Sequence, residues 1–117
     1  MSRWTVDSLI DRGPEFVRDF IRQPRGAEEF APEFSWLLLA DAIGFEAGQA
    51  RRNNQTLAAR WADVAAVLYD GLVRGSRPED ELARSVWTRK AAHYRALAAG
   101  SPPPVAASPE ARDPRPV

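Results

Sequence analysis

The sequence predicts an all-α protein, a small up-down bundle of about four helices followed by a disordered, proline-rich C-terminal tail. Apolar residues recur at three- and four-residue spacing in four segments, which is the pattern of a helix that buries one face. Short polar connections, several with glycine or proline, separate these segments. Helices joined in this way pack most simply as an up-down bundle. We therefore expect a helical domain over residues 1–100 and a tail over residues 101–117.

Composition narrows the possible functions of this 117-residue chain, which has the length of one small domain. Its 16 basic and 16 acidic residues give a net charge of zero. A dedicated nucleic-acid-binding protein usually carries a basic excess, because neutralising phosphates drives its affinity. The absence of cysteine excludes disulfides, thiolate metal sites and cysteine nucleophiles. Nucleic acid is therefore a disfavoured partner.

The sequence favours a cytoplasmic protein without a membrane span. Residues 1–11 carry charges where a signal peptide would have an apolar core. The longest apolar run, residues 36–40, is far shorter than the roughly 20 residues that cross a bilayer. The lack of cysteine fits the same location, and the composition rich in arginine and alanine indicates a bacterial source.

The first segment, residues 1–23, is predicted to form a kinked or split helix. Thr5 can accept hydrogen bonds from the free N–H groups of the first turn. Gly13 and Pro14 interrupt the apolar pattern, because proline lacks an N–H and clashes with the preceding turn. We expect the helix to kink or restart near residue 13.

The second segment, residues 32–50, is the most apolar part of the chain. Pro32 suits the first turn of a helix and Glu33 suits its positive end. The spacing predicts an inward stripe of Phe34, Leu38, Ala42 and Phe45. Other apolar residues widen this stripe beyond half of the circumference, which is typical of a helix with a second interface. We therefore predict a partner-binding surface on this helix and the turn after it, comprising Trp36, Leu39, Ile43, Arg51 and Arg52.

The last two segments are predicted to be simpler amphipathic helices. Asn53 and Asn54 suit a tight turn between helices. Gly75 then ends the third helix, and Ser76 with Glu79 matches a capping box for the fourth. A narrow seam of the third helix comprises Leu57, Trp61, Val64, Leu68 and Leu72. The inward face of the fourth helix comprises Leu82, Val86, Trp87, Ala91, Tyr94, Leu97 and Ala98.

The tail, residues 101–117, contains six of the ten prolines in the chain. This composition predicts disorder or polyproline structure. Residues 102–104 are three successive prolines, which would suit an aromatic groove on a partner, whereas a solvated tail is the simpler interpretation.

Asp41 is a carboxylate inside the apolar run of the second helix, where it needs a polar partner. Arg60 on the third helix is the predicted ion-pair partner, and a role in an interface is the alternative. Asp63 and Asp70 share a face of the third helix, which a solvated surface explains. The chain lacks the paired Glu-x-x-His motifs of di-iron bundles and any glycine-rich phosphate loop. We therefore expect no metal and no cofactor.

Arg89 and His93, on the fourth helix, resemble the catalytic pair of HEPN-type ribonucleases, which are all-helical domains with an Arg-x4–6-His motif. Three residues separate the pair here, and Lys90 follows the arginine. The resemblance implies RNA cleavage, with both side chains on one helical face converging on a phosphate. A partly exposed histidine beside Tyr94 is the alternative interpretation.

Residues 55–69, QTLAARWADVAAVLY, resemble the helix-turn-helix of bacterial regulators through Leu57, Ala58, Val64 and Tyr69. The resemblance implies DNA binding by the second helix of the motif. The glycine of the family's turn is missing, and the alanines of this stretch favour an unbroken helix.

The sequence therefore favours a non-enzymatic interaction module or small accessory subunit. We expect it to bind a protein partner, or a second copy of itself, through the second helix. The helix-turn-helix regulator and the ribonuclease remain the alternatives.

Overall fold

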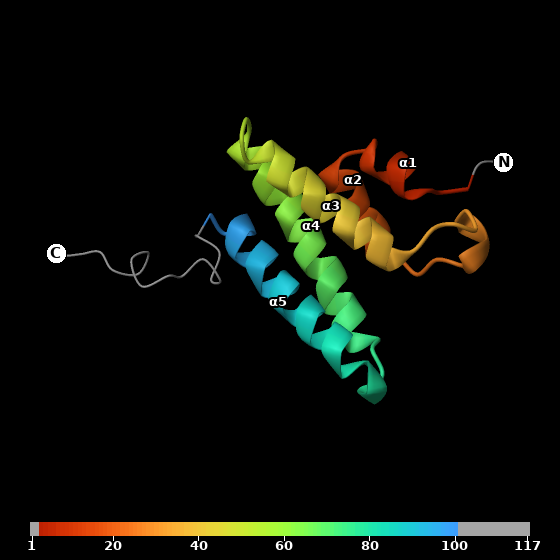
Figure 1. Ribbon diagram of the computed structural model, residues 1–117. Coiled ribbons are helices and arrows are strands. Elements are labelled where there is room, and N and C mark those ends of the chain that lie inside the picture. Colours follow the sequence, from red (N-terminus) through yellow and green to blue (C-terminus); the bar gives the residue numbers. More distant parts are fainter. Residues whose placement is uncertain (1–2, 101–117) are drawn as a thin grey trace.

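The structure, a computed structural model, describes residues 3–100, and these residues form five α-helices and two single turns of 3-10 helix (Figure 1). The predicted all-α class is confirmed. The predicted tail, residues 101–117, lies outside the described residues. In chain order the elements are α1 (Val6–Ile10), α2 (Pro14–Ile21), η1 (Ala27–Glu29), α3 (Trp36–Ala50), α4 (Gln55–Arg74), η2 (Pro78–Asp80) and α5 (Glu81–Ala98).

Helix α4 lies at the centre of the fold (Figure 1). Helices α3 and α5 pack along it and are joined to it by short turns. Helix α2 also contacts α4, and α1 packs against α2 and α3. The body of the protein is therefore three long helices, and the described helices number five rather than about four because the first segment is divided.

The division of the first segment at Gly13 and Pro14 is confirmed. Helix α1 is capped by Thr5, whose Oγ1 accepts from the N–H of Ser8 at 3.0 Å, while the N–H of Thr5 donates to Ser8 Oγ at 2.8 Å. Helix α2 restarts at Pro14 after Gly13, whose φ of 93° lies in the left-handed region that favours glycine. The two short helices are therefore separate elements, each with its own start.

A chain of six aromatic rings, the aromatic cluster, connects these helices to the start of α3. Backbone hydrogen bonds first fix Trp4 beside η1: its N–H donates to Glu29 O at 2.8 Å, and its carbonyl accepts from Ala31 N at 2.9 Å. Neighbouring ring centroids in the cluster then lie 4.4 to 6.0 Å apart, which is the range of favourable aromatic pairs. The cluster comprises Trp4, Phe16, Phe20, Phe30, Phe34 and Trp36.

Helix α3 begins at Trp36, and the predicted start at Pro32 is wrong. Ser35 is the cap residue, and its Oγ accepts from Leu37 N at 3.2 Å and Leu38 N at 3.3 Å. Pro32 and Glu33 belong to a turn before the helix. A proline side chain cannot accept a hydrogen bond, so the serine determines where the free N–H groups are satisfied.

Helix α4 packs along α3, and both helices bury small residues. The predicted cap is confirmed, since Asn54 Oδ1 accepts from Leu57 N at 3.0 Å. The buried residues of α4 include the predicted seam residues Trp61, Val64 and Leu68. Small buried residues on the two helices comprise Ala40, Gly44, Ala47, Ala58, Ala62, Ala65 and Ala66. Such residues allow two helix axes to approach.

The start of α5 differs from the predicted capping box by one residue. Ser76 Oγ donates to Val73 O at 2.7 Å, so the serine completes the end of α4. The N–H of Arg77 donates to Asp80 Oδ2 at 3.2 Å, and this pair closes the turn before α5. Leu82, predicted to face inward, is 79% exposed. It lies in the first turn of α5, just after η2.

Candidate interaction surface

The face of α3 that packs on the core differs from the predicted stripe. Leu39, Ala40, Ile43 and Ala47 are fully buried, whereas Leu38 and Phe45 are exposed. We therefore correct the assignment of the two faces, and Leu39 and Ile43 contact the core instead of a partner. The physical reason is that the small residues Ala40, Gly44 and Ala47 lie on this side, which allows it to pack closely in the core.

The exposed side of α3 is also apolar, and we call it the outer face: Leu38, Ala42 and Phe45. Leu38 is 53% exposed and Phe45 is 63% exposed, with Ala42 between them. Because an α-helix has about 3.6 residues per turn, these positions lie on one side and the buried positions on the opposite side. Trp36, in the first turn, is also partly exposed. Helix α3 is therefore apolar on two opposite sides, which is unusual for a surface helix.

A groove runs beside the N-terminal half of the outer face. It has a volume of about 490 Å³ and lies between the start of α1 and α3. Its walls include Val6, Phe34, Leu38 and Ala42. Asp7 and Glu33 are its acidic members. The groove thus offers an apolar hollow with carboxylates at its margin.

Arg51 and Arg52 lie at the opposite end of α3, where the helix turns into α4. Both side chains are exposed, and Arg51 is the C-cap residue. Within residues 3–100, neither arginine forms an ion pair, and the same holds for Asp7 and Glu33 of the groove. Of the two arginines only Arg52 lies toward the outer face, because Arg51 is on the opposite side of the helix, near His93 of α5. The outer face therefore has unpaired acidic groups at one end and the unpaired Arg52 at the other.

Asp41 joins three helices, but not through the predicted partner. The hydroxyl of Tyr69 on α4 donates to its carboxylate, and Lys90 Nζ on α5 lies 3.6 Å from Asp41 Oδ1. Arg60 instead pairs with Glu15 Oε2 of α2 at 3.1 Å. Tyr69 is buried, so its hydroxyl needs an acceptor there. The Asp41 carboxylate supplies that acceptor.

The two tyrosines of the chain stack beside Asp41. The rings of Tyr69 and Tyr94 are 5.9 Å apart and nearly parallel. Burial and the hydrogen bond to Asp41 raise the pKa of Tyr69 well above its ordinary value, and burial raises the pKa of Tyr94. Both phenols are therefore neutral at physiological pH, as expected of structural tyrosines in a helical interface.

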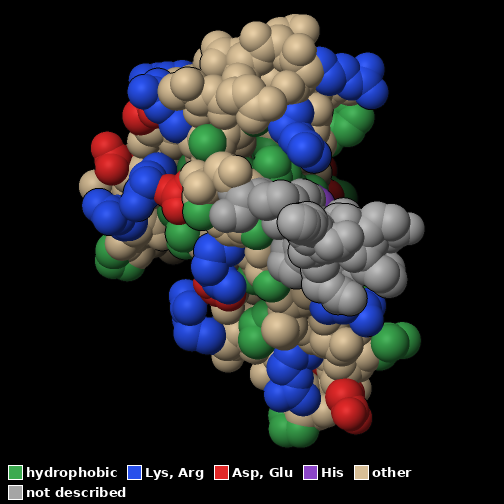
Figure 2. All heavy atoms as spheres, turned by 90° about the vertical axis from the view of Figure 1, so that its left-hand side faces the viewer, with side chains coloured by type: hydrophobic (Ala, Val, Ile, Leu, Met, Phe, Trp, Pro, Cys, Tyr) green, Lys and Arg blue, Asp and Glu red, His purple; other side chains and the backbone are tan. Residues whose placement is uncertain are grey.

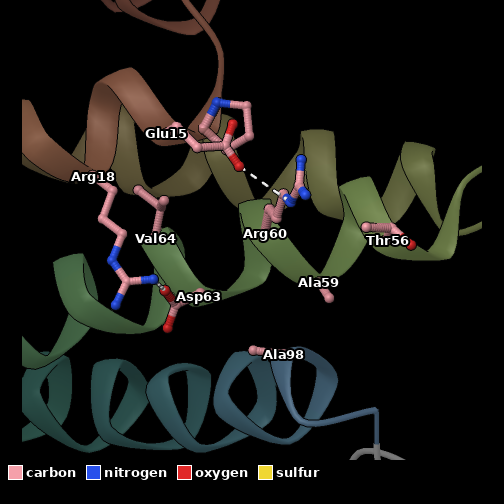
Figure 3. A pocket seen from close by; sticks show the side chains of 9 residues that line it. Glu15, Arg18, Thr56, Ala59, Arg60, Asp63, Val64 and Ala98 are labelled. Carbon is pink, nitrogen blue, oxygen red and sulfur yellow. Dashed lines mark hydrogen bonds and ion pairs between the residues drawn. The ribbon is translucent and has the colours of Figure 1, made fainter.

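A second hollow, of about 370 Å³, lies between α2 and α4 (Figure 3). Arg18 pairs with Asp63 across it, and Glu15 pairs with Arg60. All four side chains are at least one-third exposed, so these pairs contribute little stability. Each charge already has a partner of opposite sign, and the hollow has no charge left over to select a ligand.

The stretch that resembles a helix-turn-helix lies within one continuous helix, α4. Residues 55–69 contain no turn, and Ala58, Val64 and Tyr69 are buried in the core. These residues do not form the two-helix geometry of that motif. On the face of the molecule in Figure 2, Lys and Arg side chains are scattered among hydrophobic ones rather than gathered into one patch.

The pair that resembles a ribonuclease site is not held together by any hydrogen bond among the described residues. Arg89 is exposed, and His93 is partly buried with its ring at 4.9 Å from the Tyr94 ring. Burial, followed by the positive charge of Arg51, lowers the pKa of His93. The imidazole is therefore neutral at physiological pH and packs on an aromatic ring.

None of the helices within residues 3–100 has the length and apolar character of a membrane span. The same residues contain no group of three or more His, Asp or Glu side chains placed to hold a metal ion. Compared with protein-family models, curated proteins and solved structures, the chain has no significant match.

Proposed function

We propose that this chain is a non-enzymatic protein-interaction module that binds a partner through the outer face of α3. One observation carries the proposal: Leu38, Ala42 and Phe45 form an exposed apolar stripe on the side of α3 opposite the core. In this proposal α3, α4 and α5 form an up-down bundle, with α3 at its edge. We place the module in the cytoplasm, in keeping with its lack of cysteine.

The exposed stripe has the chemistry of an interface centre. Interface centres are apolar and enriched in aromatic residues, whereas charges lie at the rim. Phe45 is 63% exposed, and burying a leucine or phenylalanine side chain fully gives roughly 1.5 to 3 kcal/mol. Phe45 is therefore the best anchor on this face, with Leu38 as a second.

The partner-binding set differs from the one expected from sequence. Arg52 remains a candidate because it is exposed at the end of the outer face. Trp36 and Arg51 are exposed too, but they lie on the other side of α3: Trp36 borders a hollow beside α4, and Arg51 is near His93 of α5. Leu38 and Phe45 replace Leu39 and Ile43, which are buried.

Photo-crosslinking in the source cells tests the proposal. A benzoyl-phenylalanine at position 45 should give a covalent protein adduct, whereas the same residue at position 82, on α5, should not. Leu82 is a matched control because it is an exposed leucine outside the proposed surface. The adduct should disappear when Leu38→Asp is added. Equal labelling from both positions, or none from position 45, would reject the proposal.

A further inference from the structure

We infer that the partner is a second copy of this chain, with the two α3 helices packed antiparallel across a two-fold axis near Ala42. This inference rests on the proposed function, because it uses the same outer face. A two-fold interface uses one patch twice, so that patch must be complementary to itself. The outer face meets this requirement in shape and in charge.

The shape argument starts from Phe45 and the groove. Phe45 projects near the C-terminal end of α3, and the groove lies near the N-terminal end, where Leu38 and Ala42 form part of its wall. In an antiparallel pair centred near Ala42, Phe45 of each copy lies opposite Leu38 of the other. Each copy thus offers one projecting Phe45 ring and one groove of about 490 Å³. In the two-fold pair the ring of each copy packs at the groove of the other copy, so the same contact forms twice. The small side chain of Ala42 allows close approach at the centre.

The charge argument points to the same orientation. Asp7 and Glu33 stand at one end of the outer face, and Arg52 stands at the other. Antiparallel packing brings the acidic end of each copy to the basic end of its partner. Parallel packing would set like charges against each other, which is unfavourable. Within residues 3–100 none of Asp7, Glu33 and Arg52 forms an ion pair, so all three are free for the partner copy.

The two-fold pair also explains why one small domain has a helix that is apolar on both sides. One side of α3 meets α4 of its own chain, and the other meets α3 of the second copy. A helix that is apolar around its circumference is normally buried around its circumference. In a head-to-tail assembly the Phe45 ring of the last copy would stay exposed. In the two-fold dimer both Phe45 rings are buried, and no copy of the patch is left over.

Light scattering on the purified full chain gives the first test. The expected mass is twice the 13.0 kDa of one chain. Phe45→Asp should weaken the dimer at least about 100-fold, and Leu82→Asp should leave it unchanged. Glu33→Arg and Arg52→Glu should each weaken the dimer alone, and mixing the two variants should restore it. A full chain that stays monomeric up to millimolar concentration, or a dimer indifferent to Phe45→Asp, overturns the inference.

Disulfide trapping tests the orientation, and the natural chain has no cysteine to interfere. Ala42→Cys should form a disulfide between copies on oxidation, because position 42 lies at the axis. Gln49→Cys should not, since antiparallel packing separates the two copies of this residue by about 20 Å along the helices, and a disulfide needs about 6 Å between Cα atoms. Efficient crosslinking through position 49 would overturn the antiparallel arrangement.

The two tests fail in different ways. If the purified chain is a monomer but position 45 still crosslinks a different protein in cells, the second-copy inference falls and the proposed function stands. If position 45 yields no adduct in cells and the purified chain is a monomer, both fall.

Discussion

Gly44 of α3 lies against the phenol of Tyr94 on α5, so closely that a Cβ at position 44 would overlap the ring and its hydroxyl. Tyr94 in turn stacks on Tyr69 of α4, at 5.9 Å between centroids. Because Gly44 has no side chain, Tyr69 of α4 and Tyr94 of α5 have room to stack between the three long helices.

Gly44→Ala should destabilise the fold. Alanine is normally better than glycine within a helix by about 1 kcal/mol, but overpacking a core costs about 1 to 3 kcal/mol. The stacked Tyr94 ring has little freedom to move, so we expect a net loss of about 1 kcal/mol in urea unfolding. Gly48→Ala is the matched control in the same helix, because no atom lies within 4 Å of its added Cβ. That variant should be more stable than the natural protein, and a stabilised Gly44→Ala would contradict the described packing.

Asp41→Ala should destabilise the protein more than Tyr69→Phe. Removing the carboxylate leaves the buried Tyr69 hydroxyl without its acceptor, which costs about 1 to 3 kcal/mol. Removing the hydroxyl leaves an Asp41 side chain that is 46% exposed and can be hydrated, so the loss should be about 1 kcal/mol or less. Chemical unfolding of both variants measures the difference. The reverse order would show that the hydroxyl is satisfied by another group.

The stability of the fold should fall in alkali because of Tyr69. The pKa of Tyr69 is raised in the folded protein above the ordinary value of 10.0, so above pH 10 the unfolded chain loses this proton while the folded chain keeps it. The stabilisation that the protonated Tyr69 gives to the folded state is therefore complete below pH 10, and it is lost as pH rises further. Tyr69→Phe should therefore show a shallower loss of unfolding free energy between pH 10 and 12. Identical slopes for the two proteins would place the alkaline sensitivity elsewhere.

His93 should titrate below its ordinary pKa of 6.5, chiefly because it is partly buried and secondly because Arg51 is near. Arg51→Ala should raise the pKa only part of the way back, whereas Arg52→Ala should leave it unchanged. NMR titration of the imidazole makes this comparison directly. A histidine with a lowered pKa contributes stability above pH 6.5 that is lost as pH falls through its folded pKa. A shift in the Arg52→Ala variant equal to that of Arg51→Ala would indicate only a general effect of net charge.

The positions of the helices along the chain were largely predictable, because local chemistry determines where a helix begins and ends. Thr5 and Asn54 cap helices as their side chains suggest, and Gly13 with Pro14 divides the first segment. The starts of α3 and α5 were misplaced, each because a hydrogen-bonding side chain one or a few residues away controls the free N–H groups. Competition between neighbouring caps depends on the surrounding turn, which the sequence pattern does not specify.

The outer face could be anticipated, but its residues could not be identified. An all-round apolar helix has no polar side to indicate its orientation, so periodicity alone cannot say whether Leu38 or Leu39 faces the core. The large side chains Leu38 and Phe45 pointed to the solvent-exposed side of α3 as the core-facing side. The side that packs on the core instead contains the small residues Ala40, Gly44 and Ala47. The aromatic cluster around Phe30 was not predicted either, because it depends on how the irregular connection between α2 and α3 folds back on itself, which periodicity does not specify.

Helix α4 is central in the sequence as well as in space, and this has a consequence for folding kinetics. Its two main neighbours, α3 and α5, are the helices that precede and follow it, each joined by a short turn. Most of the core can therefore form by closing small loops, which is the topology of fast-folding proteins. The docking of α2 on α4 requires a longer loop closure, since Arg18 and Asp63 are 45 residues apart. The hairpins around α4 should therefore form first, and the packing of α2 on α4 last.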